Sequence, residues 1–162
     1  MIEAPLKLYR DVVRPEWLDY NHHLTEGFFV VIFAAASDAF LDYMQIDTRY
    51  RDLTGNSVYT LESHIKYLRE LKEGSPLVVE TRLLGYDKKR MQVFHEMFHG
   101  TEHFLAATYE VMMVHVNVEA LRTTQMPTEF SSRFERVYSA HKQLARPPQV
   151  GRSVKQLSTH TE

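Results

Sequence analysis

The sequence predicts an α+β fold in which one long buried helix packs against one antiparallel β-sheet. Two observations lead to this class. Residues 26–44 are apolar on nearly every face, and four strand-like segments joined by short polar turns follow them. A helix of this kind must be enclosed by the rest of the fold, and a run of consecutive strands supplies the covering sheet. The chain has 162 residues, which is the length of one domain.

The first two elements are a strand and the long helix. Leu6–Arg14 is rich in valine, leucine and tyrosine and ends at Pro15, which disfavours helix in the residue before it. For the next segment, Phe28–Phe33 can also be read as a buried strand, because β-branched and aromatic residues dominate it. The apolar run then continues through several alanines into an i, i+4 pattern, so we predict a helix from Glu26 to about Met44.

Four strands are expected next, separated by the turn signals E-G-S-P, G-Y-D-K-K-R and H-G-T-E. In the first of them, apolar and polar residues alternate, which puts Thr60, Glu62 and His64 on one polar face. The last strand is apolar on both faces, which is typical of a central or interface strand. The four predicted strands are Val58–Glu70, Pro76–Tyr86, Met91–Phe98 and Phe104–Val118.

The C-terminal part is predicted to be a peripheral helix followed by a tail. Residues 126–144 open with P-T-E at a plausible helix start and carry mixed charges. From Arg146 onward the chain is polar and contains P-P, which favours a loose tail. The predicted organisation is therefore one domain over residues 1–145 and a polar tail over residues 146–162.

Composition excludes several classes of function. The net charge is −2, and no basic cluster indicates a nucleic-acid partner. The chain has no cysteine, so disulfides and a cysteine nucleophile are excluded. The N-terminus lacks the pattern of a signal peptide, and the longest apolar run, residues 27–36, is too short to span a bilayer. We expect a cytoplasmic protein that binds neither nucleic acid nor membrane.

Residues 95–99 read H-E-M-F-H and match the zinc-protease signature H-E-x-x-H in letters. That signature requires a helix, where positions i and i+4 bring both imidazoles to one metal. The surrounding residues indicate a strand, on which four residues separate the two histidines by about 13 Å. We therefore predict no metal site.

Polar residues crowd the segment before the helix, which reads W-L-D-Y-N-H-H-L-T-E-G-F-F from Trp17 to Phe29. Asn21 or Thr25 could cap the helix, and Glu26 suits the positive end of the helix dipole. Ordinary caps use one or two polar residues, so the cluster also favours chemistry. Free N–H groups at a helix start can polarise a carbonyl, and Asp19 could attack it or activate water.

These residues, together with T-L-E-S-H-I-K-Y-L-R-E and the F-H-E-M strand, resemble the hotdog-fold acyl-CoA thioesterases of the 4-hydroxybenzoyl-CoA thioesterase type. The resemblance covers about residues 6–118 and is strongest to the carnitine-catabolism branch, which includes betainyl-CoA thioesterases. It implies a hotdog fold, in which a long central helix is wrapped by an antiparallel β-sheet, with the C-terminal helix added. It also implies hydrolysis of a small acyl-CoA, with coenzyme A only as part of the substrate and no other cofactor.

The family carries Asp-x-x-Gly-His at this position, so the resemblance implies that Asp19 is catalytic and that His23 matches the family histidine. His22 stands where glycine is usual, and Thr25 and Phe29 replace the usual asparagine and tyrosine. Backbone N–H groups at His23 and Leu24 are the implied donors to the thioester oxygen. A partner subunit is expected to complete each pocket, in a homodimer or homotetramer.

Further site residues have two interpretations each. Glu62 is either a second catalytic carboxylate, with Thr60 beside the substrate, or an exposed strand residue. Lys88, Lys89 and Arg90 either meet the phosphates of CoA or form a solvated turn. Several residues near the helix start either contact the substrate, with the aromatic ones holding a quaternary ammonium, or serve ordinary packing. They are Trp17, Tyr20, Asn21, Thr25, Phe28 and Phe29.

Two rival functions are compatible with the same fold. The first is a non-catalytic protein that binds an acyl-CoA or another small ligand, because a fold does not fix a function. The second is dehydratase chemistry, which usually calls for a different arrangement of His with Asp or Glu on the helix. Asp38 and Asp42, four residues apart, are expected at an exposed edge or against another chain.

Overall fold

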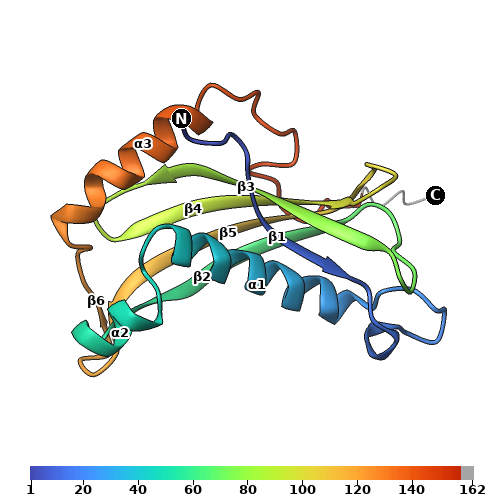
Figure 1. The fold of residues 1–162 in the computed structure, drawn as a ribbon, viewed down its shortest axis with the longest axis horizontal. Coiled ribbons are helices and arrows are strands. Elements are labelled where there is room, and N and C mark those ends of the chain that lie inside the picture. The colour runs from blue at the N-terminus through green and yellow to red at the C-terminus, as the bar shows by residue number, and fades with distance from the viewer. Residues whose placement is uncertain (158–162) are drawn as a thin grey trace.

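The computed structural model describes residues 1–157 as an antiparallel sheet with one long helix packed along one face (Figure 1). The main strand order is β1-β3-β4-β5-β2, and a short β6 pairs with the end of β5. This arrangement confirms the predicted α+β class. The strands are β1 (Leu6–Val12), β2 (Asn56–Tyr67), β3 (Pro76–Tyr86), β4 (Arg90–His99), β5 (Leu105–Asn117) and β6 (Arg122–Thr123). The helices are α1 (Glu26–Tyr43), α2 (Thr48–Thr54) and α3 (Ser131–His141), with single 3-10 turns at η1 (Pro15–Trp17) and η2 (Thr128–Phe130).

Helix α1 is the centre of the hydrophobic core. The predicted helix is confirmed over Glu26–Tyr43, and the alternative of a strand at Phe28–Phe33 is wrong. One side of the helix is exposed and carries two valines and two aspartates, so Asp38 and Asp42 lie at an exposed edge as expected. The buried side chains of α1 are Phe29, Ile32, Phe33, Ala36, Ser37 and Phe40, and the exposed ones include Val30, Val31, Asp38 and Asp42.

A neutral histidine joins α1 to the sheet inside this core. The His95 ring on β4 is fully buried, with Nδ1 2.9 Å from the Thr81 hydroxyl and Nε2 3.0 Å from the Ser37 hydroxyl. The Ser37 hydroxyl donates to the Phe33 carbonyl, so it accepts from Nε2–H, and Nδ1 accepts from Thr81. Burial lowers the pKa of His95 to about 3, which keeps the ring uncharged at neutral pH.

The H-E-x-x-H segment lies in β4, as the sequence predicts. His95 is enclosed in the core, whereas His99 lies at the end of the strand, 3.8 Å from the Glu102 carboxylate. Within residues 1–157, no three histidine or acidic side chains are placed to hold a metal ion. The strand geometry thus keeps the two histidines from acting as one ligand pair.

Helix α2 was not predicted, because the sequence predicts no element between Met44 and Val58. Asp47 caps α2 by accepting from the Tyr50 N–H at 2.8 Å, and Gly55 ends it with a φ of 67°. Tyr50 fastens α2 to the sheet through a 2.8 Å hydrogen bond to His115 Nε2. Among residues 1–157 no single helix is long and apolar enough to cross a bilayer, although α1 and α2 together, bent by 66°, have that length and composition.

The C-terminal helix is shorter than predicted, and residues 147–151 of the predicted tail pack on the sheet. Helix α3 packs beside the end of β3, where the Leu83 N–H donates to His141 Nδ1 at 2.9 Å. The chain then crosses the sheet face turned away from α1, and Pro147 and Val150 are buried there. The Gly151 N–H donates to the Glu110 carboxylate at 2.6 Å. The tail prediction for residues 158–162 lies outside the described residues.

Candidate active site

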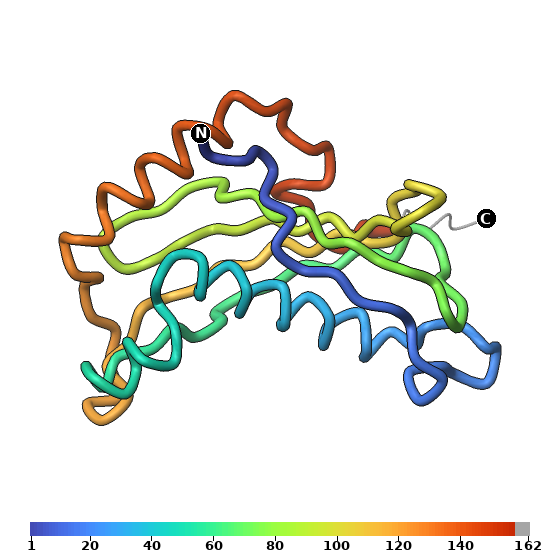
Figure 2. Tube along the Cα trace, viewed as in Figure 1, coloured from blue at the N-terminus to red at the C-terminus, as the bar shows by residue number. Residues whose placement is uncertain are grey.

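The loop before α1 is held against a second loop that links β2 to β3. The Leu24 N–H donates to the Leu71 carbonyl at 2.8 Å, and His23 and Lys72 form an isolated β-bridge. Figure 2 shows the two loops side by side at one end of the molecule. His22 has a φ of 60°, in the left-handed region where glycine is favoured. A positive φ at this position explains why the family that the sequence resembles carries glycine here.

Asp19 lies at the centre of this loop with one carboxylate oxygen engaged. Its Oδ1 accepts from the Asn21 N–H at 2.8 Å and from the His23 N–H at 3.2 Å. Within residues 1–157, no hydrogen-bond donor or cation reaches Oδ2. The Asp19 N–H donates to the His23 carbonyl at 2.9 Å, and His23 Nε2 lies 3.6 Å from Glu70. The loop therefore orients the carboxylate and leaves one oxygen available for chemistry.

The structure corrects the predicted oxyanion donors. The His23 N–H is taken by Asp19, and the Leu24 N–H is taken by Leu71, so neither can reach a substrate. Thr25 is the N-cap of α1 but makes no side-chain capping bond. Across residues 1–157, no acceptor pairs with the N–H groups of Glu26 and Gly27, which are the first two of the helix. A Cβ added to Gly27 would meet no atom within 4 Å, so the side of the helix at Gly27 is open.

The predicted aromatic cage does not form within this chain. The Trp17 ring is buried and stacks on Phe28 at a centroid distance of 5.5 Å. The Arg14 guanidinium lies over the Trp17 ring, 4.4 Å from its centroid. Phe29 is buried in the core, where it meets Tyr67 edge to face. Tyr20 is 91% exposed and projects from the loop. Trp17, Phe28 and Phe29 therefore serve packing in the single chain, as the alternative interpretation holds, and Tyr20 does not.

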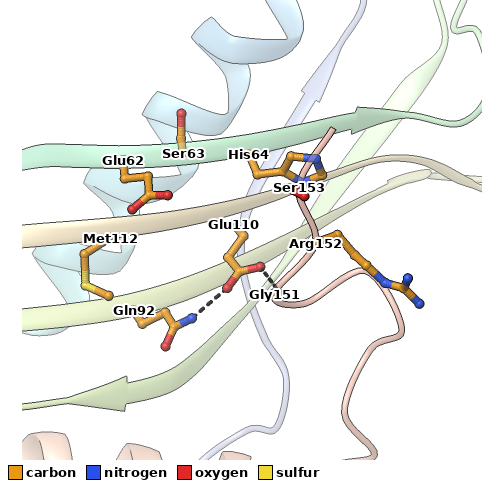
Figure 3. Close-up of a pocket in the computed structure, with 9 residues that line it drawn as sticks. All are labelled: Glu62, Ser63, His64, Gln92, Glu110, Met112, Gly151, Arg152 and Ser153. Atoms are coloured by element: carbon orange, nitrogen blue, oxygen red, sulfur yellow. Dashed lines mark hydrogen bonds between the residues drawn. The ribbon is translucent and has the colours of Figure 1, made fainter. Parts of the chain in front are cut away.

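Glu62 and Thr60 lie on opposite faces of the sheet, contrary to the predicted shared face. A β-bulge at Leu61 pairs Thr60 with the core residue Met113 and Glu62 with Met112 on the other face. Glu62 lines a cavity of about 320 Å³ between β2 and the C-terminal segment, here residues 142–157, which follow α3. Glu110 and residues 151–153 also line it. Figure 3 shows this cavity, with Glu110 bonded to both Gln92 and Gly151. Asp19 is not among its lining residues, so one chain does not bring the two carboxylates together.

The basic residues of the β3–β4 hairpin lie at the opposite end of the sheet from the start of α1 (Figure 1). Asp87 accepts hydrogen bonds of 2.7 and 2.9 Å from the Arg90 guanidinium. The bond from the Lys89 backbone N–H and, second, the contact with Arg90 hold the pKa of Asp87 below its usual range. Lys88 and Lys89 line a surface pocket together with Leu61 of the edge strand β2. Asp19 and these lysines therefore do not form one site within the chain.

Four contributors to the site were not predicted from the sequence. They are the free N–H groups of Glu26 and Gly27, the Leu71 carbonyl that holds Leu24, and the Tyr67 ring beside Phe29. Only Glu26 and Gly27 left a signal, because the first N–H groups of any helix lack intrahelical partners. The other two depend on contacts between segments more than 35 residues apart, which no local pattern reveals.

The sequence was compared with protein families and with characterised proteins, and both comparisons find thioesterases. Residues 13–134 match the protein family described as the thioesterase-like superfamily. A betainyl-CoA thioesterase from Pseudomonas aeruginosa is 37% identical over 149 residues, which cover 92% of this chain and 94% of that protein. An L-carnitine dehydrogenase/betainyl-CoA thioesterase from Agrobacterium fabrum is 42% identical over 125 residues, which cover 77% of this chain and 25% of that longer protein.

Among solved structures, a Staphylococcus aureus protein in complex with CoA has a TM-score of 0.88 and 25% identity, covering 97% of this chain and 99% of its own. The similarity therefore extends over the helix α1, the sheet and the C-terminal helix together. The family match from residue 13 to residue 134 contains both the Asp19 loop and the loop against which it pairs.

Proposed function

The chain belongs to the thioesterase-like superfamily and is an acyl-CoA thioesterase, and we propose that it hydrolyses betainyl-CoA with Asp19 as nucleophile or general base. The observation that carries the assignment of Asp19 is its Oδ2 oxygen, which no donor within residues 1–157 reaches, in the loop that leads into α1, whose first two N–H groups have no acceptor among the same residues. The substrate assignment is supported by the Pseudomonas aeruginosa relative, which matches this chain over nearly its whole length.

The thioester oxygen accepts hydrogen bonds from the Glu26 and Gly27 N–H groups, which stabilise the negative charge that develops on it. In one route Asp19 Oδ2 attacks the carbonyl carbon, the C–S bond breaks, and CoA leaves as a thiolate. Water then hydrolyses the mixed anhydride to free acid and regenerated Asp19. In the other route Asp19 takes a proton from water, and the resulting hydroxide attacks the same carbon. The C–S bond then breaks, and the CoA thiolate leaves and takes up the proton held by Asp19. A thiolate is a good leaving group, so neither route needs a strong general acid.

A second copy of the chain is proposed to complete the site. Strand β2 lies at one edge of the sheet and exposes large apolar side chains, which in a single chain would be left in water. Antiparallel pairing of β2 with the β2 of a partner continues the sheet through both subunits. The exposed apolar residues are Tyr59, Leu61, Tyr67 and Leu68 on or just after β2 and Val30 and Val31 on α1.

This arrangement also gives Lys88 and Lys89 a role. Antiparallel pairing reverses the strand direction, so the hairpin end of one subunit approaches the α1 start of the other. The two lysines border the β2 edge through Leu61 and are placed to meet CoA phosphates bound at the partner's Asp19. Arg90 is already paired with Asp87 and contributes less.

The substrate is tested by thiol release from two acyl-CoAs of the same shape. Betainyl-CoA carries a trimethylammonium group, and 3,3-dimethylbutyryl-CoA carries a neutral tert-butyl group in its place. We expect kcat/KM to be higher for betainyl-CoA by about 5- to 30-fold, because recognition of a cation contributes about 1 to 2 kcal/mol. Equal kcat/KM values, or a preference for the neutral thioester, would exclude betainyl-CoA as the preferred substrate.

A further inference from the structure

We propose that the Glu26 carboxylate and the Tyr67 ring form the subsite that selects a cationic acyl group. The inference rests on the proposed function and names the part of the site that recognises the substrate's trimethylammonium group. It replaces the predicted aromatic cage, whose Trp17 and Phe29 rings are buried in the core.

The position of the cation follows from the position of the carbonyl. In a betainyl thioester the nitrogen is bonded to the carbon next to the carbonyl carbon, so nitrogen and carbonyl carbon are about 2.5 Å apart, as in an amino acid. With the thioester oxygen on the Glu26 and Gly27 N–H groups, the cation lies close to the first turn of α1. No heavy atom lies within 4 Å of a Cβ placed at Gly27, so the helix surface there is open.

Two suitable groups border that turn. Glu26 is the first residue of α1, and within residues 1–157 no cation lies within ion-pair distance of its carboxylate. The Tyr67 ring is 45% exposed and packs edge to face on Phe29, with centroids 5.4 Å apart. Phe29 follows Glu26 by three residues, so both lie on the same side of the helix, next to Tyr67. Burial and, second, the Glu26 carboxylate raise the pKa of Tyr67.

The charge of Glu26 supports the same conclusion. A carboxylate beside an oxyanion hole repels the negative charge that develops on the thioester oxygen and is unfavourable for hydrolysis of a neutral acyl group. With a cationic acyl group, the trimethylammonium lies between the two negative charges and offsets the repulsion. Asp19, the other carboxylate of the site, has the same sign and adds to the attraction of a cation. The tyrosine ring adds a cation–π contact to the same group.

The test compares selectivity, defined as kcat/KM for betainyl-CoA divided by kcat/KM for 3,3-dimethylbutyryl-CoA. Glu26→Gln keeps the backbone N–H and the side-chain size, and we expect it to lower the selectivity about tenfold or more. Glu26→Asp keeps the charge and should retain most of the selectivity. Tyr67→Leu should lower it severalfold, while Tyr67→Phe, which keeps the ring, should not. Glu73→Gln, which removes an exposed carboxylate from the loop after β2, is the matched control.

The outcomes separate the subsite from the proposed substrate. Suppose that the wild type prefers betainyl-CoA and that Glu26→Gln lowers kcat/KM equally for both thioesters. Glu26 then acts only through the helix start, so the proposed subsite is wrong, although the proposed substrate is still supported. If the wild type prefers the neutral thioester, both the substrate and the subsite are wrong. A circular-dichroism melt of each variant shows whether a loss of activity comes from unfolding, and because selectivity is a ratio, it does not change with the folded fraction.

Discussion

In the proposed site Glu26 carries two groups with separate roles, a backbone N–H that binds the thioester oxygen and a carboxylate that faces the acyl group. Glu26→Pro removes the N–H with little effect on the helix, because proline is favoured at the first helical position. Thr25 before it is already extended, with φ −69° and ψ 149°, as a residue preceding proline requires. Glu26→Ala removes the same carboxylate but keeps the N–H. We expect kcat of Glu26→Pro to be about 10²- to 10³-fold below that of Glu26→Ala.

The comparison of these two variants isolates the N–H, since both lack the carboxylate. Steady-state thiol release with the neutral 3,3-dimethylbutyryl-CoA is the suitable measurement, because it does not depend on the cation subsite. Equal kcat values for the two variants would show that the Glu26 N–H does not contact the reacting oxygen.

His95 makes stability depend on pH. In the folded chain its pKa is lowered to about 3, against about 6.5 when unfolded, so its contribution is complete above pH 6.5 and is lost as the pH falls toward 3. Between pH 7 and pH 5.5 the unfolded ring gains a proton and the folded ring does not. We expect this to remove roughly 1 kcal/mol of unfolding free energy. Urea denaturation at the two pH values should show a smaller loss for His95→Gln, and an equal loss would contradict a neutral buried ring.

The residue scale also shows which parts of the site a sequence can reveal. Asp19 could be found, because an aspartate in a polar cluster before a buried helix is a local pattern. The donors could not be assigned correctly, because the N–H groups of His23 and Leu24 are occupied by Asp19 and by Leu71 in another loop. Because these two N–H groups are occupied, the first free donors are the N–H groups of Glu26 and Gly27 in the helix itself.

At the scale of elements, the chain after α3 packs on the sheet at residues 147–151. Val150 is buried against the sheet, whereas Val154 in the same segment is 83% exposed. Val150→Ala removes two buried methyl groups and should lower the unfolding free energy by about 1.5 kcal/mol. Val154→Ala, the matched control, should change it by less than about 0.5 kcal/mol. Equal effects in urea denaturation would mean that the segment does not pack on the sheet in solution.

The elements that the sequence predicted well are those with long, regular patterns. Helix α1 and four of the strands have such patterns, and their observed bounds differ from the predicted ones by three residues or fewer. Helix α2 has only seven residues and was missed, although its N-cap Asp47 and its C-terminal Gly55 are ordinary helix signals. The bulge at Leu61 reverses the faces of Thr60 and Glu62, and it depends on pairing with β5.

At the scale of the whole molecule, Asp19 and the lysines that meet CoA, Lys88 and Lys89, belong to different subunits in the proposed dimer. Leu61→Lys places a charge in the middle of the β2 edge, where it would be buried between the subunits, and should yield monomers with little thioesterase activity. Val12→Lys places the same charge on β1, at the other edge of the sheet, where the valine is 48% exposed. It should leave the assembly unchanged. Sedimentation velocity checks both, and a Leu61→Lys protein that stays dimeric would exclude β2 as the interface.

Asp19 is the group on which the whole mechanism depends, and Asp19→Asn is the most direct test. The asparagine side chain keeps an oxygen that can accept from the Asn21 and His23 N–H groups, so the loop should persist while the nucleophile or base is lost. Glu16→Gln, which changes an exposed carboxylate in the adjacent 3-10 turn, is the matched control. The measurement is kcat for thiol release from betainyl-CoA by the wild type and the two variants. We predict that kcat falls by about 10²- to 10⁴-fold in Asp19→Asn and is unchanged in Glu16→Gln, whereas wild-type turnover by Asp19→Asn would contradict the proposed mechanism.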